Sequence, residues 1–311
     1  MEKYRDIISL VDTIESRHRT IAVAGADDDA VMGAVAAGIR QGIGFILIGN
    51  PDRIRAAGDE SGVSLDGVNI RSAENGDAQD ENGYCRTAAR LCADGRAGVM
   101  MKGRLGTAAF TRAILDKQIG LTEKGALLSH VGLFSDPRNG RSFLVTDAAI
   151  NIAPDLEAKK RILANAVKVA RALGAEVPRI ALLAPVEKIS PKIASTVDAA
   201  ALKEWVAQGG LGEAKADGPF ALDAAASAEA AAVKGISDTV AGRADIFLAP
   251  NLDTGNVLYK SLTVFAGASS AGMLAGAKVP VVLTSRSDSD ETKWASVALA
   301  LRIAAYYGAT S

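Results

Sequence analysis

Short apolar runs rich in β-branched residues alternate with alanine-rich stretches along almost the whole chain. The apolar runs have the length of buried strands, and the alanine-rich stretches have the length and composition of helices. This alternation is typical of βαβ units around a mostly parallel sheet, so the sequence predicts an α/β fold. Strands are expected at 20–24, 45–48, 98–101, 126–133, 142–146, 179–184, 246–249 and 279–284. Helices are expected at 28–40, 106–118, 155–173, 191–208, 223–234, 256–274 and 289–306.

The size and charge of the chain exclude several classes of protein. Its 311 residues are 49% hydrophobic, which is enough for an ordinary core and suggests roughly two domains. Lysine plus arginine (35) nearly equals aspartate plus glutamate (36), so no basic face for nucleic acid or anionic lipid is expected. The N-terminus has no apolar signal core, and no window approaches 18 apolar residues, which predicts a cytoplasmic protein that does not enter a membrane.

Histidines and cysteines are too few for several kinds of site. His18 lies in a charged stretch, and His130 lies in an apolar run, where we expect a hydrogen-bonded core or cleft residue. Cys85 and Cys92 are seven positions apart on an expected helix, a spacing that fits neither a redox pair nor a zinc site. We interpret both as packing thiols, and we expect no metal site and no histidine-dependent triad.

The turn after the first expected strand reads GADDD, not GxGxxG. Three acids there would repel a pyrophosphate, and no GxxxxGK[ST] motif occurs in the chain. A nicotinamide dinucleotide site in this turn is therefore disfavoured. Residues 56–82 are rich in glycine and acids with weak periodicity, and we interpret them as a surface excursion.

The run VVLTSRSDSDETK places an arginine among carboxylates directly after an apolar strand. Ligands of open α/β sheets bind beyond the carboxyl ends of strands, where the next helix presents unpaired N–H groups. Ser285 and Arg286 would stand at such a position, and the guanidinium suits phosphate or carboxylate. Asp288 and Glu291 have the spacing of a capping box, whereas Asp290 is a candidate proton acceptor.

Two other stretches present cations near helix starts, each with an alternative structural role. In PNLDTGNVLYKS, Lys260 could bind the same anion as Arg286, and Asn256 could bind a ligand or serve as an N-cap. In MKGRLGT, Lys102 and Thr107 flank another expected helix start, a pattern that many βα turns share.

Two acidic stretches could likewise either bind a ligand or have only a structural role. VTDAAIN places Asp147 and Asn151 after a strand, and KADGPFALDAA contains Asp217 and Asp223 around a DGP turn signal.

Seven blocks in order resemble the phosphate acetyltransferase and phosphate butyryltransferase family from about residue 95 to the C-terminus. They are MKGRLGT, LLSHVGLF, VTDAAINIAPDLEAKKRILANAVKVARALG, RIALLAPVEKISPKIASTVDAAALKE, ADGPFALDAAAS, KGISDTVAGRADIFLAPNLDTGNVLYKSL and AKVPVVLTSRSDSDETKWAS. The forms VTDAA, DGP, GN and LTSR resemble the phosphate butyryltransferase branch more than the acetyl branch.

The resemblance implies a reversible reaction of acyl-CoA with phosphate that gives acyl phosphate and free CoA, with CoA as a substrate and without metal or redox cofactor. Arg286 would hold phosphate, and Ser285 would donate a hydrogen bond to the reacting carbonyl oxygen or the thiolate sulfur. In the acetyl branch an aspartate seven positions after the serine is the base, and that position here is Thr292. Asp290 is our first candidate for the base, and Asp288 is the second.

For the other candidate residues we expect binding of phosphate or CoA; they are Lys260, Asn256, Lys102 and Thr107. The family also implies two three-layer α/β domains on the isocitrate/isopropylmalate dehydrogenase scaffold, with a cleft between them. We place the first at 1–121 plus 275–311 and the second at 122–274, with a homodimer built on the second.

Three alternatives remain open at this point. The first is phosphate acetyltransferase activity on acetyl-CoA. The second is an oxidoreductase on the same scaffold, although Asp147, Asp217 and Asp253 do not form a recognisable metal set. The third is a non-catalytic CoA or phosphate binder, which the threonine at 292 keeps open.

Overall fold

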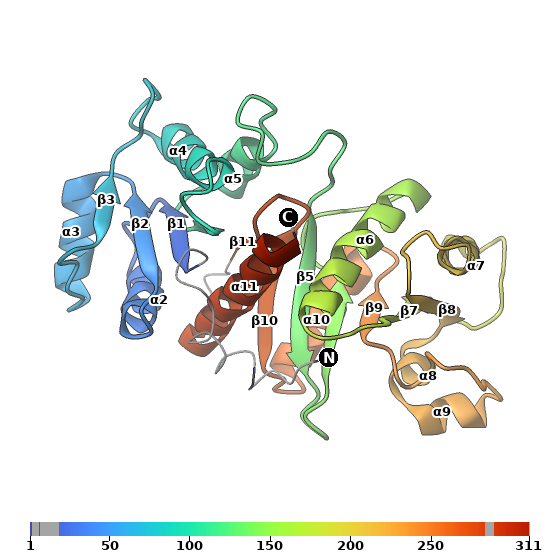
Figure 1. Cartoon of the computed structure of the whole chain (residues 1–311). Coiled ribbons are helices and arrows are strands. Elements are labelled where there is room, and N and C mark those ends of the chain that lie inside the picture. The colour runs from blue at the N-terminus through green and yellow to red at the C-terminus, as the bar shows by residue number, and fades with distance from the viewer. Residues whose placement is uncertain (2–5, 7–18, 284–288, 311) are drawn as a thin grey trace. The chain divides into compact units, whose positions relative to one another are not determined.

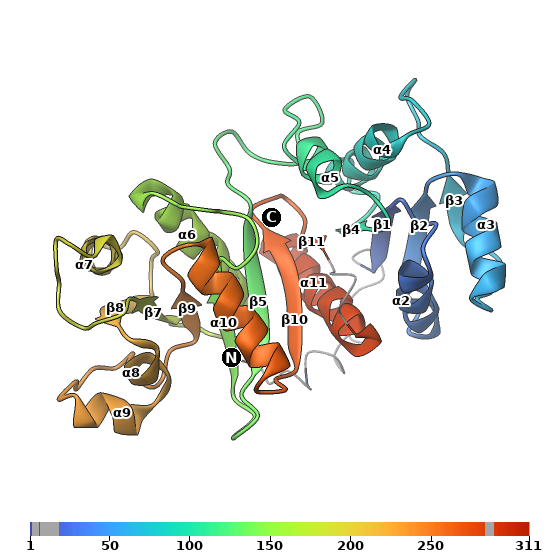
Figure 2. The same ribbon diagram turned by 180° about the vertical axis from the view of Figure 1, so that it is seen from behind.

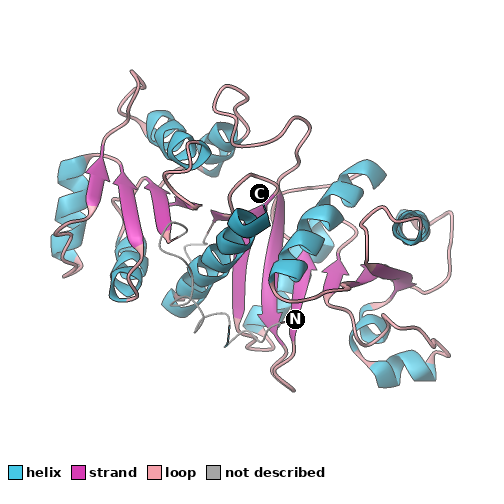
Figure 3. Cartoon of the chain, in the orientation of Figure 1, coloured by secondary structure: helices cyan, strands magenta, loops and turns pink. Residues whose placement is uncertain are grey.

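The computed structural model describes residues 1, 6, 19–283 and 289–310. It contains two compact units: unit 1 comprises Met1–Tyr4 and Leu127–Ser270, and unit 2 comprises Arg5–Ala126 and Ala271–Ser311. In each unit, helices lie against strands, and most neighbouring strands are parallel (Figure 3). The predicted α/β fold class is therefore confirmed.

The sheet of unit 2 has the strand order β3-β2-β1-β4-β11-β10. Its strands are β1 (Thr20–Ala24), β2 (Gly44–Ile48), β3 (Asn69–Arg71), β4 (Val99–Lys102), β10 (Ser270–Ala275) and β11 (Val281–Val282). Neighbours from β3 to β11 run parallel, whereas β10 and β11 are antiparallel, with Leu274 opposite Val281. The carboxyl ends of β1, β4 and β11 therefore share one edge of this sheet.

Helices cover both faces of the unit 2 sheet (Figure 1). On one face, α2 (Asp29–Arg40) and α11 (Asp290–Thr310) cover a core that includes Ile21, Met101 and Leu301. The opposite face carries α4 (Glu81–Ala93) and α5 (Thr107–Ile114), and α3 (Pro51–Glu60) joins β2 to β3. Strands buried on both faces explain why the apolar runs of the sequence are continuous rather than alternating.

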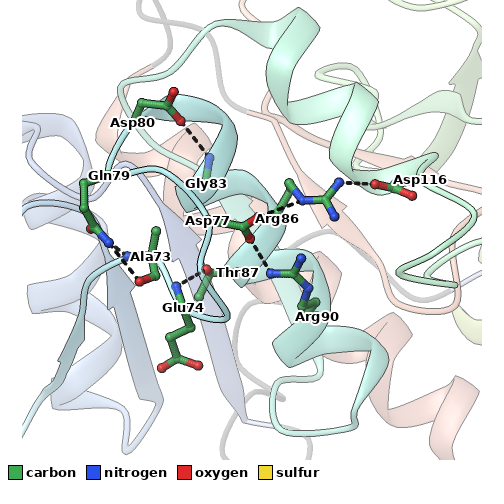
Figure 4. Close-up of polar contacts among 10 residues, drawn as sticks. All are labelled: Ala73, Glu74, Asp77, Gln79, Asp80, Gly83, Arg86, Thr87, Arg90 and Asp116. Atoms are coloured by element: carbon green, nitrogen blue, oxygen red, sulfur yellow. Dashed lines mark hydrogen bonds and ion pairs between the residues drawn. The ribbon is translucent and has the colours of Figure 1, made fainter.

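An ion-pair network ties the segment before α4 to that helix (Figure 4). The Asp77 carboxylate contacts both Arg86, at 3.2 Å from Nε, and Arg90, and Arg86 also binds Asp116. The hydrogen bond from Arg90 is the main cause that lowers the pKa of Asp77. The stretch 56–82 therefore contains the end of α3, the edge strand β3 and a turn that ion pairs hold to α4. It is more regular than the surface excursion that the sequence predicted.

The sheet of unit 1 has the strand order β5-β6-β9-β7-β8. β5 (Ser129–Ser135) and β6 (Ser142–Thr146) are antiparallel, and the other neighbours are parallel: β7 (Arg179–Leu183), β8 (Lys215–Phe220) and β9 (Ile246–Leu248). Figure 1 shows α6 (Leu156–Ala172) and α7 (Ala194–Ala207) on the near side. α8 (Leu222–Ala226), α9 (Ala228–Val233) and α10 (Leu252–Val264) lie on the other side, where Figure 2 shows α10 in front.

Two predicted elements are wrong. The helix predicted at 256–274 ends at Val264, and SAGMLA forms the fully buried strand β10. Gly267, with a φ of +60°, follows the helix, and pairing within the sheet overrides the helix propensity of the alanines. The helix predicted at 223–234 is divided at Ser227, whose hydroxyl accepts the Ala230 N–H and starts α9.

Candidate active site

The segment that carries Ser285, Arg286 and Asp288 lies outside the described residues. Its flanks nevertheless show where it leaves the sheet. β11 runs parallel to β4 with Val282 opposite Met101, so the chain after β11 and the chain after β4 leave from neighbouring strands. In an open α/β sheet, this carboxyl edge is where ligands bind.

Lys102 ends β4 and folds back over its own loop. Its Nζ donates hydrogen bonds to the carbonyls of Gly103 and Leu105, both at 3.0 Å. The loop is also bonded to the end of β1 and the turn after it, because the Gly103 N–H donates to the Ala24 carbonyl at 2.8 Å and the Arg104 N–H donates to the Gly25 carbonyl at 2.9 Å. A Cβ at Gly103 would lie 2.0 Å from the Gly25 carbonyl, so only glycine permits this close approach.

Thr107 is the exposed first residue of α5, but the start of this helix already faces an acid. The N-cap residue, Gly106, provides no side-chain cap, and its N–H donates to the Glu81 carboxylate at 3.1 Å. A carboxylate from α4 therefore stands where the sequence predicts an anion site. Glu81 is a residue that sequence reasoning missed, because the contact joins positions 25 residues apart.

Asp290, the first candidate for the base, lies at the start of α11. Its side chain is 88% exposed, and Oδ1 lies 3.4 Å from Lys293 Nζ. Ser289 caps the helix, since its Oγ accepts the Thr292 N–H at 3.2 Å and lies 3.1 Å from Thr292 Oγ1. Thr292 therefore takes part in the helix cap. The capping-box role predicted for Asp288 with Glu291 involves a residue outside the described part of the chain.

Lys293 is a second residue that the sequence analysis did not single out. The residue is only 7% exposed, yet its ammonium reaches the Asp290 carboxylate at the helix start. The available signal was its position three residues after Asp290, a spacing at which helical side chains meet. A cation at this position complements the carboxylates that precede it.

In unit 1, Asn256 and Lys260 project from one face of α10, both exposed. Asn256 is not the N-cap: that residue is Asn251, whose side chain accepts the Thr254 N–H at 2.9 Å. The Asn256 amide instead donates to the Ala148 carbonyl at 3.1 Å and holds α10 against the loop after β6. The described contacts of Asn256 are therefore structural, and its predicted role in ligand binding stays a prediction.

The polar side chains of the loop after β6 form hydrogen bonds with backbone groups. The buried Asp147 carboxylate accepts the N–H groups of Ala149 and Ile150 at 2.9 and 3.0 Å, and Asn151 donates to the Leu128 carbonyl at 2.9 Å. A Cβ at Gly255 would lie 2.1 Å from the Asp147 carbonyl, which explains the glycine in the GN pair. Asp147 and Asn151 thus shape the loop that supports α10.

The thiols are buried, as the packing interpretation predicts. Burial raises the pKa of Cys85 to about 12, and burial also raises the pKa of Cys92. Across residues 19–283 and 289–310, no three His, Cys, Asp or Glu side chains gather in a way that could hold a metal ion. Within the same part of the chain, no helix combines the length and apolarity needed to cross a membrane.

Comparison with known proteins identifies the family. The model of a family described as "Phosphate acetyl/butaryl transferase" matches residues 78–301. A protein named phosphate butyryltransferase, from Clostridium acetobutylicum, is 41% identical over 305 residues, which cover 98% of this chain and 99% of the relative. The chain belongs to the phosphate acetyl/butaryl transferase family.

Both branches of the phosphate acetyl/butaryl transferase family are similar to this chain. A phosphate acetyltransferase from Rhizobium meliloti is 38% identical over 92% of this chain and 89% of its own length. A crystal structure titled as a branched-chain phosphotransacylase from Enterococcus faecalis V583 has a TM-score of 0.80 and 35% identity, and the match covers 92% of this chain and 98% of that one. The predicted family resemblance is thus confirmed along nearly the whole chain.

Proposed function

We propose that the protein is an acyltransferase that moves a butanoyl group reversibly between CoA and inorganic phosphate. The observation that carries this proposal is the 41% identity over 98% of the chain to a protein named phosphate butyryltransferase. The edge shared by β4 and β11 supports it, since the SRSDSD segment and Lys102 follow neighbouring parallel strands there. CoA is a substrate in this reaction, and no further cofactor is required.

The proposed chemistry is a direct displacement at an acyl carbon. In one direction a phosphate oxygen attacks the thioester carbon, the C–S bond breaks, and CoA leaves as a thiolate that takes up a proton. In the other direction the CoA thiol loses its proton to a base, its sulfur attacks the acyl phosphate, and phosphate departs with the electron pair of the C–O bond. A free thiol of pKa about 8.5 is only a few per cent thiolate at neutral pH, so a base assists this direction.

We assign the catalytic roles to residues of the SRSDSD segment. Arg286 holds the phosphate, and Ser285 donates a hydrogen bond to the carbonyl oxygen or the sulfur. Asp290 is the proposed base and Asp288 the alternative. The exposed position of Asp290 at a helix start leaves its carboxylate where a substrate can reach it.

Phosphate and CoA are further bound, in this proposal, by Lys102 and Thr107 in unit 2 and by Asn256 and Lys260 in unit 1. We also propose that the two compact units correspond to the expected domains, 1–121 plus 275–311 and 122–274. The protein would act in the cytoplasm as a homodimer.

Thiol release from butyryl-CoA, isobutyryl-CoA and acetyl-CoA tests the activity. Release should depend on phosphate, proceed without added metal or nicotinamide, and be fastest with butyryl-CoA. Arg286→Gln should lower kcat/KM for phosphate by at least about 100-fold, because a charge-assisted contact to the reacting group is lost. Arg55→Gln, on the exposed surface of α3, is the matched control.

The same assay distinguishes the alternatives. Fastest release from acetyl-CoA would identify a phosphate acetyltransferase, and absence of release from all three thioesters would refute the enzyme assignment in favour of a binder. For the base, Asp290→Asn should lower kcat about 10²–10⁴-fold, whereas Glu291→Gln in the same helical turn should not. Unchanged turnover in both Asp290→Asn and Asp288→Asn would show that neither carboxylate is the base.

A further inference from the structure

Unit 1 contains a pocket of about 760 Å³ that none of the predicted site residues lines. Its lining includes residues just beyond the ends of three neighbouring parallel strands: Ala184 and Pro185 after β7, Ala221 after β8, and Pro250 after β9. The pocket therefore opens at the carboxyl edge of the unit 1 sheet. Its volume is in the range of small-molecule sites in proteins.

The topology of unit 1 places a crevice at this position. From β7 the chain continues through α7 to β8, on one side of β7. β9 is the neighbour on the other side of β7. From β9 the chain continues into α10, which lies towards β6, because Asn256 of α10 contacts Ala148 in the loop after β6. The two connections thus diverge from adjacent strands, and ligands of open α/β sheets bind at such switch points.

One wall of the pocket carries a buried cation. Lys159 on α6 is only 5% exposed, and its Nζ lies 2.5 Å from Asp198 Oδ2 on α7. A lysine ammonium has three N–H donors, and Asp198 accepts one of them. Ser195 lines the same wall in the first turn of α7, whose N-cap residue, Ile193, provides no side-chain cap. The Thr196 N–H in this turn donates to the Ile193 carbonyl at 2.9 Å, and the positive end of the helix dipole favours an anion next to the Lys159 ammonium.

The rest of the lining is mostly apolar. Leu183, Pro185, Leu222 and Leu258 line it, and Leu222 is 44% exposed although it is a large hydrophobic residue. Covering such a surface with an apolar group removes it from water, which favours binding. A ligand that suits both parts has an anionic head for Lys159 and an apolar body for the leucine and proline side chains.

We propose that this pocket is a binding site for an amphipathic oxyanion, that is, a carboxylate or phosphate head attached to a short hydrocarbon body. The head contacts Lys159 and the start of α7, and the body lies against Leu183, Pro185 and Leu222. Asp198 holds Lys159 in place by accepting one of its N–H groups, and the ligand accepts another. This site goes beyond the proposed acyl transfer, because all of its lining residues belong to unit 1 and binding requires no turnover.

Saturation-transfer NMR titrations of the full chain with hexanoate, hexyl phosphate and 1-hexanol test the site, without CoA or phosphate. Ala194→Trp places a bulky ring at an exposed lining position, and Lys159→Met removes the cation. Lys160→Met makes the same charge change at the next position of α6, which does not line the pocket. Arg286→Gln separates this site from the proposed catalytic site.

We expect saturable binding of at least one of the two anions, with an affinity at least tenfold above that of 1-hexanol. Ala194→Trp and Lys159→Met should each weaken it at least tenfold, while Lys160→Met and Arg286→Gln leave it within twofold. The ratio of hexanoate to hexyl phosphate affinity identifies the preferred head group. The proposal is overturned by absence of saturable binding, by equal binding of 1-hexanol, or by unchanged affinity in Ala194→Trp, whether or not the protein transfers acyl groups.

Discussion

The Glu81 carboxylate accepts the backbone N–H of Gly106 at 3.1 Å, so an acid from α4 occupies the start of α5. Thr107 is the first residue of this helix and Lys102 ends the preceding strand, and both are proposed phosphate or CoA contacts. An acid so close to an incoming anion weakens anion binding through repulsion and competes for the helix N-terminus.

Replacement of Glu81 by glutamine should therefore improve phosphate binding. We expect the KM for phosphate to fall about two- to fivefold at low ionic strength with kcat nearly unchanged, since only local repulsion is removed. Steady-state kinetics with butyryl-CoA at varied phosphate measure the effect, which should shrink at high salt. Glu60→Gln, at an exposed position of α3, is the control; an unchanged KM in Glu81→Gln would show that phosphate does not approach α5.

Asp77 should contribute a pH-dependent part of the stability of unit 2. Because Arg90 lowers its folded-state pKa, the contribution is full above the unfolded pKa of about 3.9 and is lost as the pH falls through the folded pKa. Asp77→Asn should reduce the free energy of unfolding by about 1–3 kcal/mol at pH 7, with a smaller difference near pH 3. Urea denaturation of both proteins measures this, with the exposed Asp59→Asn as control. A difference that is the same at both pH values would contradict the assigned ionisation.

Ser296 should stabilise the attachment of α11 to β10. Its buried hydroxyl accepts the Gly272 N–H at 2.9 Å and donates to the Thr292 carbonyl at 2.8 Å. Ser296→Ala leaves the N–H unpaired and should cost about 1–3 kcal/mol of unfolding free energy in denaturant titrations. Ser64→Ala removes an exposed hydroxyl contact and should cost less. Equal losses in the two variants would argue against the hydrogen bond as the cause.

Cys85 and Cys92 should not react with a thiol dye in the native protein. Both are buried, and burial raises the pKa of each, so the reactive thiolate is scarce at pH 8. Absorbance with the dye in excess should show negligible labelling over the time of an activity assay, and two labels per chain in denaturant. Rapid labelling of native protein would contradict the buried positions of the two cysteines. The signal from such labelling would then have to be subtracted from the thiol-release assay.

The elements that the sequence predicted well are those whose pattern is local. β1 and β6 have the predicted bounds, and α6 and α11 begin within one residue of the predicted start, because compact apolar runs and N-cap residues define them. β10 was mistaken for helix because its small residues have helix propensity, and only its neighbours in the sheet make it a strand.

The candidate site was predictable only in part, for a similar reason. The strand that leads to Ser285 and Arg286 was expected from its apolar run, and the structure places its end beside β4. Glu81 could not be assigned, since its contact with the Gly106 N–H joins the starts of two separate helices. Lys293 was overlooked although its spacing of three residues from Asp290 is a local signal. Ser289 was overlooked as a cap because three acids surround it.

β8 is the last strand of its sheet, and it contains the DGP sequence that predicted a turn. Pro219 lacks an N–H group, the pairing with β7 shifts register near it, and Lys215 and Asp217 add charge along the strand. An edge with these features is a poor template for another strand. Two copies of the chain would therefore not extend this sheet into a continuous one through β8, and any assembly involving unit 1 would have to use its helices or loops.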